Sequence, residues 1–310
     1  MKNPRFLSCF PRGVLCVFLT LLLGCSTSSF GVPFSENTNI GIHEAVSTTQ
    51  GNVASLPASL PEKGFHVRIA GYNIAHARGS TAGNFLQEMA KPKNLDGIGS
   101  LLKDSAVDVC GLTEVSNGDL RAGFQNQPQH IAKKLGFHFV YGENVSRVFG
   151  LMATQGNAII SRFPILSSTN HKLWRKNKKN EQRSCLEGLL DLGKNRRLRV
   201  FIGHLSLDSE ESTRQIEDIY SMISKSAEPV VLIGDFNSRP KSDRIKWLSE
   251  RMTDASVKID TTYMNKPGVK IDYQFMKGGI RAGTPSVAGF KEGYSDHGCL
   301  MNDYWIDDEE

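Results

Sequence analysis

A short apolar run that ends in an acid and an amide constrains this chain most. Residues 229–240 read Pro-Val-Val-Leu-Ile-Gly-Asp-Phe-Asn-Ser-Arg-Pro, so that Gly234 stops a β-branched run over 230–233. Such a run predicts a buried strand. Side chains two residues apart on a strand share a face, so Asp235 and Asn237 should project together from its end. Because the same residue types also form ordinary turns, this segment alone leaves a plain turn open.

The same construction recurs along the chain. Other strand-like runs also end in, or are edged by, polar side chains, and a buried strand gains no packing energy from such groups. Acids, amides and imidazoles brought to one sheet edge would instead hold water against a phosphate, so the repetition favours a catalytic edge over a series of turns. The residues concerned are Asn73, Glu114, His204, Asp272, Asp296 and His297.

The N-terminus predicts export. The first 24 residues have a basic start and an apolar stretch over 14–23, which is too short to span a bilayer as a helix. We therefore expect a signal peptide over 1–24. Its removal takes away three of the 37 Lys and Arg and none of the 32 Asp and Glu, so the formal net charge falls from +5 to +2. Charge thus gives no argument for a nucleic-acid partner.

The signal ends in Leu22-Leu23-Gly24-Cys25, which resembles the lipobox of bacterial lipoproteins. The resemblance implies cleavage before Cys25, acylation of that residue, and anchoring to a membrane on the periplasmic side or at the cell surface. The alternative is a plain signal peptide with a chance cysteine. Residues 25–62, rich in Ser, Thr, Asn and Pro, predict a flexible tether behind the acylated cysteine.

Residues 63–306 should form one α/β domain, followed by an acidic tail over 307–310. Several strand-like runs are continuously apolar, which suits sheets buried on both faces. Apolar residues at helical spacing predict helices over 94–103 and 210–224. The composition, 39% hydrophobic and 22% charged, fits an ordinary globular protein. We expect a monomer. Buried free thiols are the default for Cys110, Cys185 and Cys299, with a disulfide such as Cys185 to Cys299 left open.

Taken in order, the motifs resemble the endonuclease/exonuclease/phosphatase family, the deoxyribonuclease-I-like fold, over essentially all of 65–301. The resemblance implies a four-layered α/β sandwich of two packed mixed sheets flanked by helices, with the active site where the loops of the two sheets meet. It also implies metal-assisted hydrolysis of a phosphate ester. The segments that carry it are Tyr72-Asn73-Ile74-Ala75-His76, Gly111-Leu112-Thr113-Glu114-Val115, Gly156-Asn157-Ala158, His204-Leu205, Gly234-Asp235-Phe236-Asn237, Ile271-Asp272-Tyr273 and Ser295-Asp296-His297.

The family pattern assigns a metal ligand and its neighbour. Glu114 resembles the Mg²⁺ ligand, with Asn73 assisting beside it and Mn²⁺ as the alternative ion. Mg²⁺ favours one or two carboxylates together with water and substrate oxygens, which suits so sparse a set. Some branches, including those acting at abasic DNA sites, place an acid shortly after the asparagine. Here Ile74, Ala75 and His76 follow instead, which argues against a second metal ligand and against DNA repair.

The remaining roles concern water and phosphate. By the resemblance, Asp235 would orient or deprotonate the attacking water and Asn237 would donate to a phosphate oxygen. His204 and His297 would face the phosphoryl group as imidazolium cations. Asp272 or Asp296 would pair with a histidine and raise its pKa.

Four further residues are candidates for contact with the phosphate. Asn157 and Arg183 are expected to bind substrate, although Asn157 could instead cap a turn. His76 and Arg78 would reach the phosphate or lie in a solvated loop.

Substrate identity stays open at this level. Residues 171–183 gather Lys and Arg around Trp174, which would suit a nucleic-acid backbone or an anionic lipid surface, or simply a solvated loop. The leading hypothesis is a membrane-tethered, Mg²⁺-dependent phosphodiesterase or nuclease outside the cytoplasm. The alternatives are a hydrolase of phospholipids or small phosphate esters on the same fold, and a catalytically silent surface-binding module.

Overall fold

The computed structural model describes residues 64–81 and 87–307. The predicted signal peptide, Cys25 and the tether lie outside these residues, as does nearly all of the acidic tail, so those expectations stay predictions. No helix among the described residues has the length and apolarity needed to cross a membrane. Cys110, Cys185 and Cys299 are buried free thiols, as expected by default.

Within the described residues, the strands form two mixed sheets. The first has seven strands, in the order β11-β13-β1-β2-β4-β3 with β12 also paired to β13, and the second has six, in the order β5-β6-β7-β8-β10-β9. The first comprises β1 (Phe65–Asn73), β2 (Val109–Val115), β3 (His138–Arg147), β4 (Ala153–Ser161), β11 (Ile280–Ala282), β12 (Ser286–Ala288) and β13 (Cys299–Ile306). The second comprises β5 (Ile165–Lys172), β6 (Ser184–Gly193), β7 (Arg196–His204), β8 (Val230–Asp235), β9 (Thr253–Asp254) and β10 (Asp272–Lys277).

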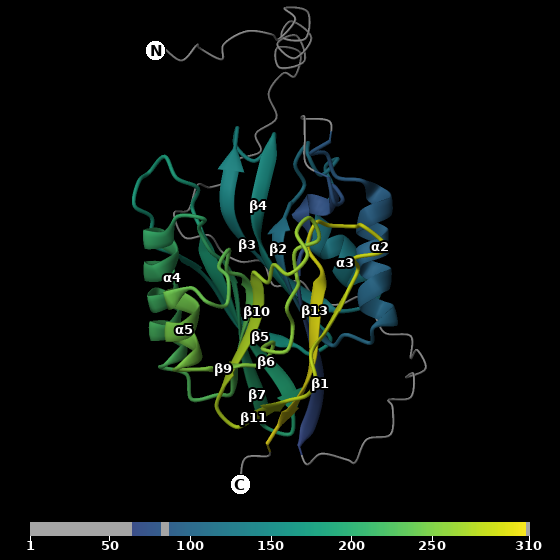
Figure 1. Ribbon diagram of the computed structural model, residues 1–310. Helices are drawn as coiled ribbons and strands as arrows, with labels where there is room; N and C mark the ends of the chain where they lie inside the picture. Colours follow the sequence, from purple (N-terminus) through teal and green to yellow (C-terminus); the bar gives the residue numbers. More distant parts are fainter. Residues whose placement is uncertain (1–63, 82–86, 308–310) are drawn as a thin grey trace, which may run out of the picture. The chain divides into compact units, whose positions relative to one another are not determined.

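Helices cover the outer face of each sheet (Figure 1). Helices α2 (Pro92–Asp104) and α3 (Gln127–Leu135) flank the first sheet, and α4 (Ser209–Ile223) and α5 (Asp243–Ser249) flank the second. A short 3-10 turn, η1 (Ala75–Ala77), follows β1. Asp208 fixes the start of α4, because its side chain accepts hydrogen bonds from the backbone N–H groups of Glu210 and Glu211.

Strand alternation divides the apolar side chains among three cores. On β7, Val200 and Ile202 face the first sheet, whereas Phe201 faces α4 and α5. On β1, Ile69 belongs to the core between the sheets and Ala70 to the core beneath α2 and α3. Since both sheets bury both faces, their central strands are largely apolar throughout. The predicted four-layered α/β sandwich is therefore confirmed.

Strand direction determines where the polar strand ends lie. β1 runs parallel to β2, and β7 runs parallel to β8, so each pair ends at a common edge. Gly234 has a φ of +154°, and a Cβ there would lie 1.8 Å from the carbonyl oxygen of Gly203. Glycine thus lets β7 and β8 pair up to their last residues, where His204 is in register with Asp235. Asp272 pairs with Asp235 from the other side, at the start of β10.

Candidate active site

An amide joins acids that come from the two sheets. Asn73 ends β1, and its Nδ2 donates to Glu114 Oε1 at 3.2 Å and to Asp235 Oδ2 at 3.1 Å. Its Oδ1 accepts from the backbone N–H of Ala75 at 3.0 Å, which leaves only Nδ2 to face the carboxylates. Asn73 therefore holds together a carboxylate from each sheet, as expected for an active site at their common edge.

Glu114 sits on a β-bulge. The pairing of β2 with β4 shifts register between Leu112 and Val115, and Glu114 has a φ of +52°. This left-handed backbone is unfavourable for glutamate, and bulges of this kind re-aim a side chain. The Glu114 side chain remains 25% exposed while its neighbours on β2 are buried, so solvent and ligand reach its carboxylate.

His297 forms the expected pair with Asp272. Its Nδ1 lies 2.9 Å from Asp272 Oδ2, and its Nε2 lies 3.7 Å from Asp235 Oδ2. Burial lowers the pKa of His297, but the nearby Asp272 and Asp235 carboxylates outweigh it and raise the pKa to about 10. His297 is therefore an imidazolium near neutral pH.

The pKa of Asp235 is also raised, which in an acid favours the neutral form. Burial and the neighbouring Asp272 raise the pKa of Asp235 to about 7. A carboxylate with such a pKa accepts and releases a proton near neutral pH, which suits a general base. The backbone N–H of Asn237 donates to Asp235 Oδ1 at 2.9 Å, and the Asn237 side chain donates to the carbonyl of Leu205 at 3.0 Å. Asn237 thereby fixes the carboxylate and the loop after β7.

His204 is brought to the same edge but in a different charge state. Its Nε2 lies 3.7 Å from Asp235 and 3.9 Å from Glu114. Burial, followed by the positive charge of Arg183, holds the pKa of His204 well below its usual value. The expectation that both histidines are cations is therefore wrong for His204, which is neutral.

Arg183 faces the site as expected, with Nη1 2.8 Å from the ring nitrogens of His204 and 3.2 Å from Glu181.

Asp296 does not pair with a histidine. Its Oδ2 lies 2.8 Å from Arg78 Nη2, while Arg78 Nε lies 3.3 Å from Glu88. Arg78 is buried, so the alternative of a solvated loop is wrong for this residue. The pair is held against β1 because the neighbouring Ser295 donates from Oγ to the carbonyl of Asn73 at 2.7 Å.

Asn157 is buried in β4 and links the sheets. Its Nδ2 donates to the backbone carbonyls of Ser184 at 3.0 Å and Ile202 at 3.3 Å. Its Oδ1 has no hydrogen-bond partner among the described residues. A role in substrate binding stays a prediction for Asn157.

His76 is a site residue that sequence reasoning left undecided. It is buried in η1 with a φ of +53°, and its Nδ1 lies 3.0 Å from Ser116 Oγ. Its Nε2 lies 3.7 Å from Glu114 Oε2, on the other carboxylate oxygen from the one that Asn73 and His204 face. Burial lowers the pKa of His76, so a neutral imidazole flanks Glu114. The only indication in the sequence that His76 belongs to the site is its position three residues after Asn73.

Two groups of donors at this edge suit a divalent cation. Asp235, Asp272 and His297 offer ligand atoms within 4.8 Å of one another, but Asp272 and His297 already satisfy each other. Glu114 instead presents a partly exposed carboxylate beside Asn73 and Asp235. Hard oxygen donors with open positions for water fit Mg²⁺ or Mn²⁺, so Glu114 is the better ligand.

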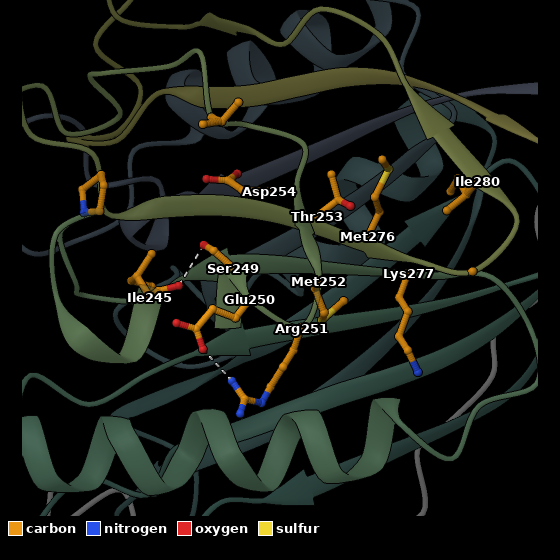
Figure 2. A pocket seen from close by; sticks show the side chains of 13 residues that line it. Ile245, Ser249, Glu250, Arg251, Met252, Thr253, Asp254, Met276, Lys277 and Ile280 are labelled. Atoms are coloured by element: carbon orange, nitrogen blue, oxygen red, sulfur yellow. Dashed lines mark hydrogen bonds and ion pairs between the residues drawn. The ribbon is translucent and has the colours of Figure 1, made fainter. Parts of the chain in front are cut away.

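A hollow of ≈ 710 Å³ lies elsewhere, between α5 and strands β9 to β11 (Figure 2). Its lining includes Met252, Asp254 and Lys277. None of the predicted site residues lines it. Although it is roomier than the edge where Asn73, Glu114 and Asp235 meet, it brings together no comparable set of acid, amide and imidazole groups.

Comparison with known proteins agrees with the fold. Residues 71–297 match the model of the endonuclease/exonuclease/phosphatase family, and the chain belongs to that family. Its members are hydrolases of phosphate esters and are typically dependent on divalent metals.

Individual relatives are distant. The protein cwh43 of Schizosaccharomyces pombe (strain 972) is 27% identical over 135 residues, which make up 43% of this chain and 13% of that protein. An endonuclease/exonuclease/phosphatase from Beutenbergia cavernae DSM 12333 superposes with a TM-score of 0.63 at 19% identity, covering 78% of this chain and 72% of the other. A mannosyl-6-phosphatase of Bacteroides thetaiotaomicron VPI-5482 gives 0.62 at 15% identity, covering 77% and 100%. These structures establish the shared fold.

The pairing of His297 with Asp272 predicts a measurable titration. In Asp272→Asn the amide no longer stabilises the imidazolium, while burial still opposes it, so the pKa of His297 should fall from about 10 toward or below the ordinary 6.5. Proton NMR titration of the His297 ring would measure it. The native pair stabilises the fold fully below pH 6.5 and loses that contribution as pH rises through about 10. An unchanged His297 titration in Asp272→Asn would contradict the pairing.

Proposed function

We propose that this chain is a Mg²⁺- or Mn²⁺-dependent phosphodiesterase. The observation that carries the proposal is the Asn73 amide, which holds Glu114 of one sheet and Asp235 of the other within one buried edge. Beside them stands an imidazolium, His297, held in that state by Asp272. A base, a cation and a partly exposed carboxylate are the groups that hydrolysis of a phosphate ester requires.

Each residue of the site has its own role in the proposed hydrolysis. Asp235 accepts the proton of the attacking water, since its raised pKa matches neutral pH. The His297 imidazolium donates to a phosphoryl oxygen and offsets the charge that develops there. Asn73 fixes Glu114, which would hold the metal, and Asn237 fixes Asp235. A divalent metal, when bound, supplies further charge neutralisation and lowers the pKa of bound water.

The charge of the site favours a diester over a monoester. A phosphate monoester carries about −1.5 to −2 at pH 7, because its second pKa is about 6, whereas a diester carries a single charge. Of the cations near this edge, Arg78 is paired with Asp296 and Glu88, Arg183 contacts Glu181, and Arg121 lies near the carboxylates of Asp119 and Glu114. His297 is itself flanked by carboxylates. So little uncompensated positive charge suits the singly charged ester.

Hydrolysis of two simple esters tests the proposal. The purified full chain would be assayed on bis(p-nitrophenyl) phosphate and p-nitrophenyl phosphate with Mg²⁺, with Mn²⁺ and with EDTA. Metal-dependent turnover that is faster on the diester would support the proposal. Preference for the monoester would make the chain a phosphatase, the activity named for the structural neighbour from B. thetaiotaomicron. Folded protein that turns over neither ester would leave a narrow-specificity enzyme or a silent binding module, and metal-binding calorimetry would then separate the two.

We further propose that the protein is exported and membrane-anchored through Cys25. The support is the Leu22-Leu23-Gly24-Cys25 segment after a basic, apolar N-terminus. Replacing Cys25 with Ser would remove the acylated residue, and several acyl chains bind a membrane far more firmly than one. We expect the Cys25→Ser protein to lose its acyl label and to leave the membrane fraction. Incorporation of labelled fatty acid and cell fractionation would measure both, and persistent labelling would contradict the anchor.

A further inference from the structure

The hairpin of β3 and β4 ends in an exposed apolar tip, residues 148–151. Phe149 is 98% exposed, Val148 61% and Leu151 55%. Phe124, which is 61% exposed, lies on the adjacent 119–125 turn, where the N–H of Leu120 donates to the carbonyl of Leu151. Single exposed apolar residues are ordinary on protein surfaces, but a cluster of four large ones marks an interaction site.

The apolar tip projects beyond the site edge. β3 and β2 are both antiparallel to β4, so the turn after β3 lies at the same edge as Glu114. Val115 is in register with Gly156, and the hairpin continues for three more residues to the Arg147–Ala153 pair before it turns. At about 3.3 Å per residue this carries the tip roughly 10 Å past the end of β2. Figure 1 shows β3 and β4 extending beyond the other strands at that edge.

Folding does not require apolar residues in this turn. Val148 and Phe149 have φ values of +52° and +53°. The N–H of Leu151 donates to the carbonyl of Val148, so Phe149 and Gly150 are the central residues of the turn, where Asn-Gly is the usual pair. Phe149 stands where Asn is usual, and the β-branched Val148 before it is strained by its own positive φ. A fully exposed aromatic ring gains nothing from the core either. Strain of this kind concentrates at functional positions, so the tip is better explained by what it contacts.

A basic loop, residues 172–183, lies beside the hairpin. It ends at β6, whose first residues are in register with the end of β7, and Gln155 of β4 donates to Glu181 of the loop at 3.1 Å. Lys178 and Lys179 are exposed. Trp174 is not the exposed aromatic that the sequence suggested, because it is half-buried with Arg214 4.1 Å from the ring centroid. The exposed aromatic side chain near the basic loop is instead Phe149.

We propose that the apolar tip and the basic loop together dock the site edge on an anionic phospholipid surface. The tip's side chains would enter the boundary between head groups and acyl chains, and the lysines would face lipid phosphates. Nucleic acid fits less well, because Phe149 and Phe124 offer stacking faces for bases but the aliphatic Val148 and Leu151 do not. A protein partner fits less well too, since a stable interface buries about 800 Å² on each side and the tip is narrow. This docking goes beyond the proposed chemistry and does not depend on it.

A tryptophan placed at the tip tests the docking directly. The full chain carrying Phe149→Trp would be mixed with vesicles of brominated phosphatidylglycerol, whose bromines quench only tryptophans that enter the bilayer. Leu166→Trp is the matched control, because Leu166 is also exposed but lies near the start of β5, at the opposite end of the second sheet. Emission of the unsubstituted chain is subtracted from both. Because the quenching reports each position, an acyl anchor elsewhere in the chain does not mimic it.

The outcomes are distinct. We expect strong quenching and a blue shift for Phe149→Trp and neither for Leu166→Trp. Replacing Lys178 and Lys179 with Glu in the Phe149→Trp chain should weaken its apparent vesicle affinity by roughly 30-fold or more, since each basic residue near an anionic surface contributes about 1 kcal/mol and the glutamates add repulsion. Equal quenching at both positions, no quenching at either, or a Phe149→Trp response to single-stranded DNA without one to vesicles would overturn the proposal. Turnover of the soluble diester, measured on the same proteins, reports the chemistry separately.

Discussion

Replacing Asp235 with Asn should lower kcat/KM for a phosphodiester by about 10³- to 10⁴-fold, the upper part of the range for loss of a general base. Asn keeps the shape of Asp235, and its Oδ1 still accepts from the N–H of Asn237. Its NH2 group replaces Oδ2, so it no longer accepts from Asn73 Nδ2, and it takes no proton from water near neutral pH. The loss should lie in kcat, because the contact proposed between His297 and a phosphoryl oxygen remains. Steady-state kinetics with Mg²⁺ would measure it.

Measuring thermal stability distinguishes the loss of the general base in Asp235→Asn from misfolding. Burial and Asp272 raise the pKa of Asp235 from 3.8 to about 7, so ionising the buried carboxylate destabilises the fold increasingly as pH rises between those values. The Asn variant escapes this cost but loses the hydrogen bond from Asn73, so its melting temperature at pH 7 should stay close to that of wild type. Asp243→Asn, at a fully exposed acid of α5, is the control; it should leave the rate unchanged and lower stability only slightly, because its ion pair with Lys246 is exposed. Activity of Asp235→Asn within tenfold of wild type would exclude Asp235 as the base.

The elements that sequence predicted well are those whose surroundings are uniform. The run over 230–233 lies between the core shared with the first sheet and the core beneath α4 and α5, so it is apolar throughout and was identified as a strand. Helix α4 was expected over 210–224 and spans Ser209–Ile223, since one face is buried at helical spacing. By contrast β5, Ile165–Lys172, is an edge strand with mostly exposed Ser, Thr and Asn, and its sequence resembles a loop.

The sequence predicted which residues form the site but not which of them contact one another. The motif order placed Asn73, Glu114 and Asp235 together because strand ends share an edge. The partner of Asp296 could not be foreseen, since Arg78 is 218 residues away and competes with the histidines. The charge of His204 depends on burial and on Arg183, which follows from packing rather than from any motif. The bulge at Glu114 likewise arises only when β2 pairs with β4.

Replacing Glu114 with Gln should weaken Mn²⁺ or Mg²⁺ binding by at least about 100-fold and lower turnover correspondingly, since even outer partners of metal ligands contribute 10- to 100-fold. Gln keeps an oxygen that accepts from Asn73 Nδ2 at the position of Glu114 Oε1, so the edge should remain folded. What is lost is the negative charge that the cation requires. Calorimetric titration of the full chain with Mn²⁺ measures affinity without relying on activity.

Comparison with Asp272→Asn decides where the metal is held. If Glu114 is the ligand, Asp272→Asn should bind Mn²⁺ within about threefold of wild type, because Asp272 is committed to His297 at 2.9 Å. The reverse result, with affinity lost in Asp272→Asn and kept in Glu114→Gln, would move the metal to the Asp235, Asp272 and His297 group. In that case His297 would have to bind the metal as a neutral ring, and its role as an imidazolium facing the phosphate would be lost. One pair of titrations therefore tests both the metal site and the proposed source of positive charge.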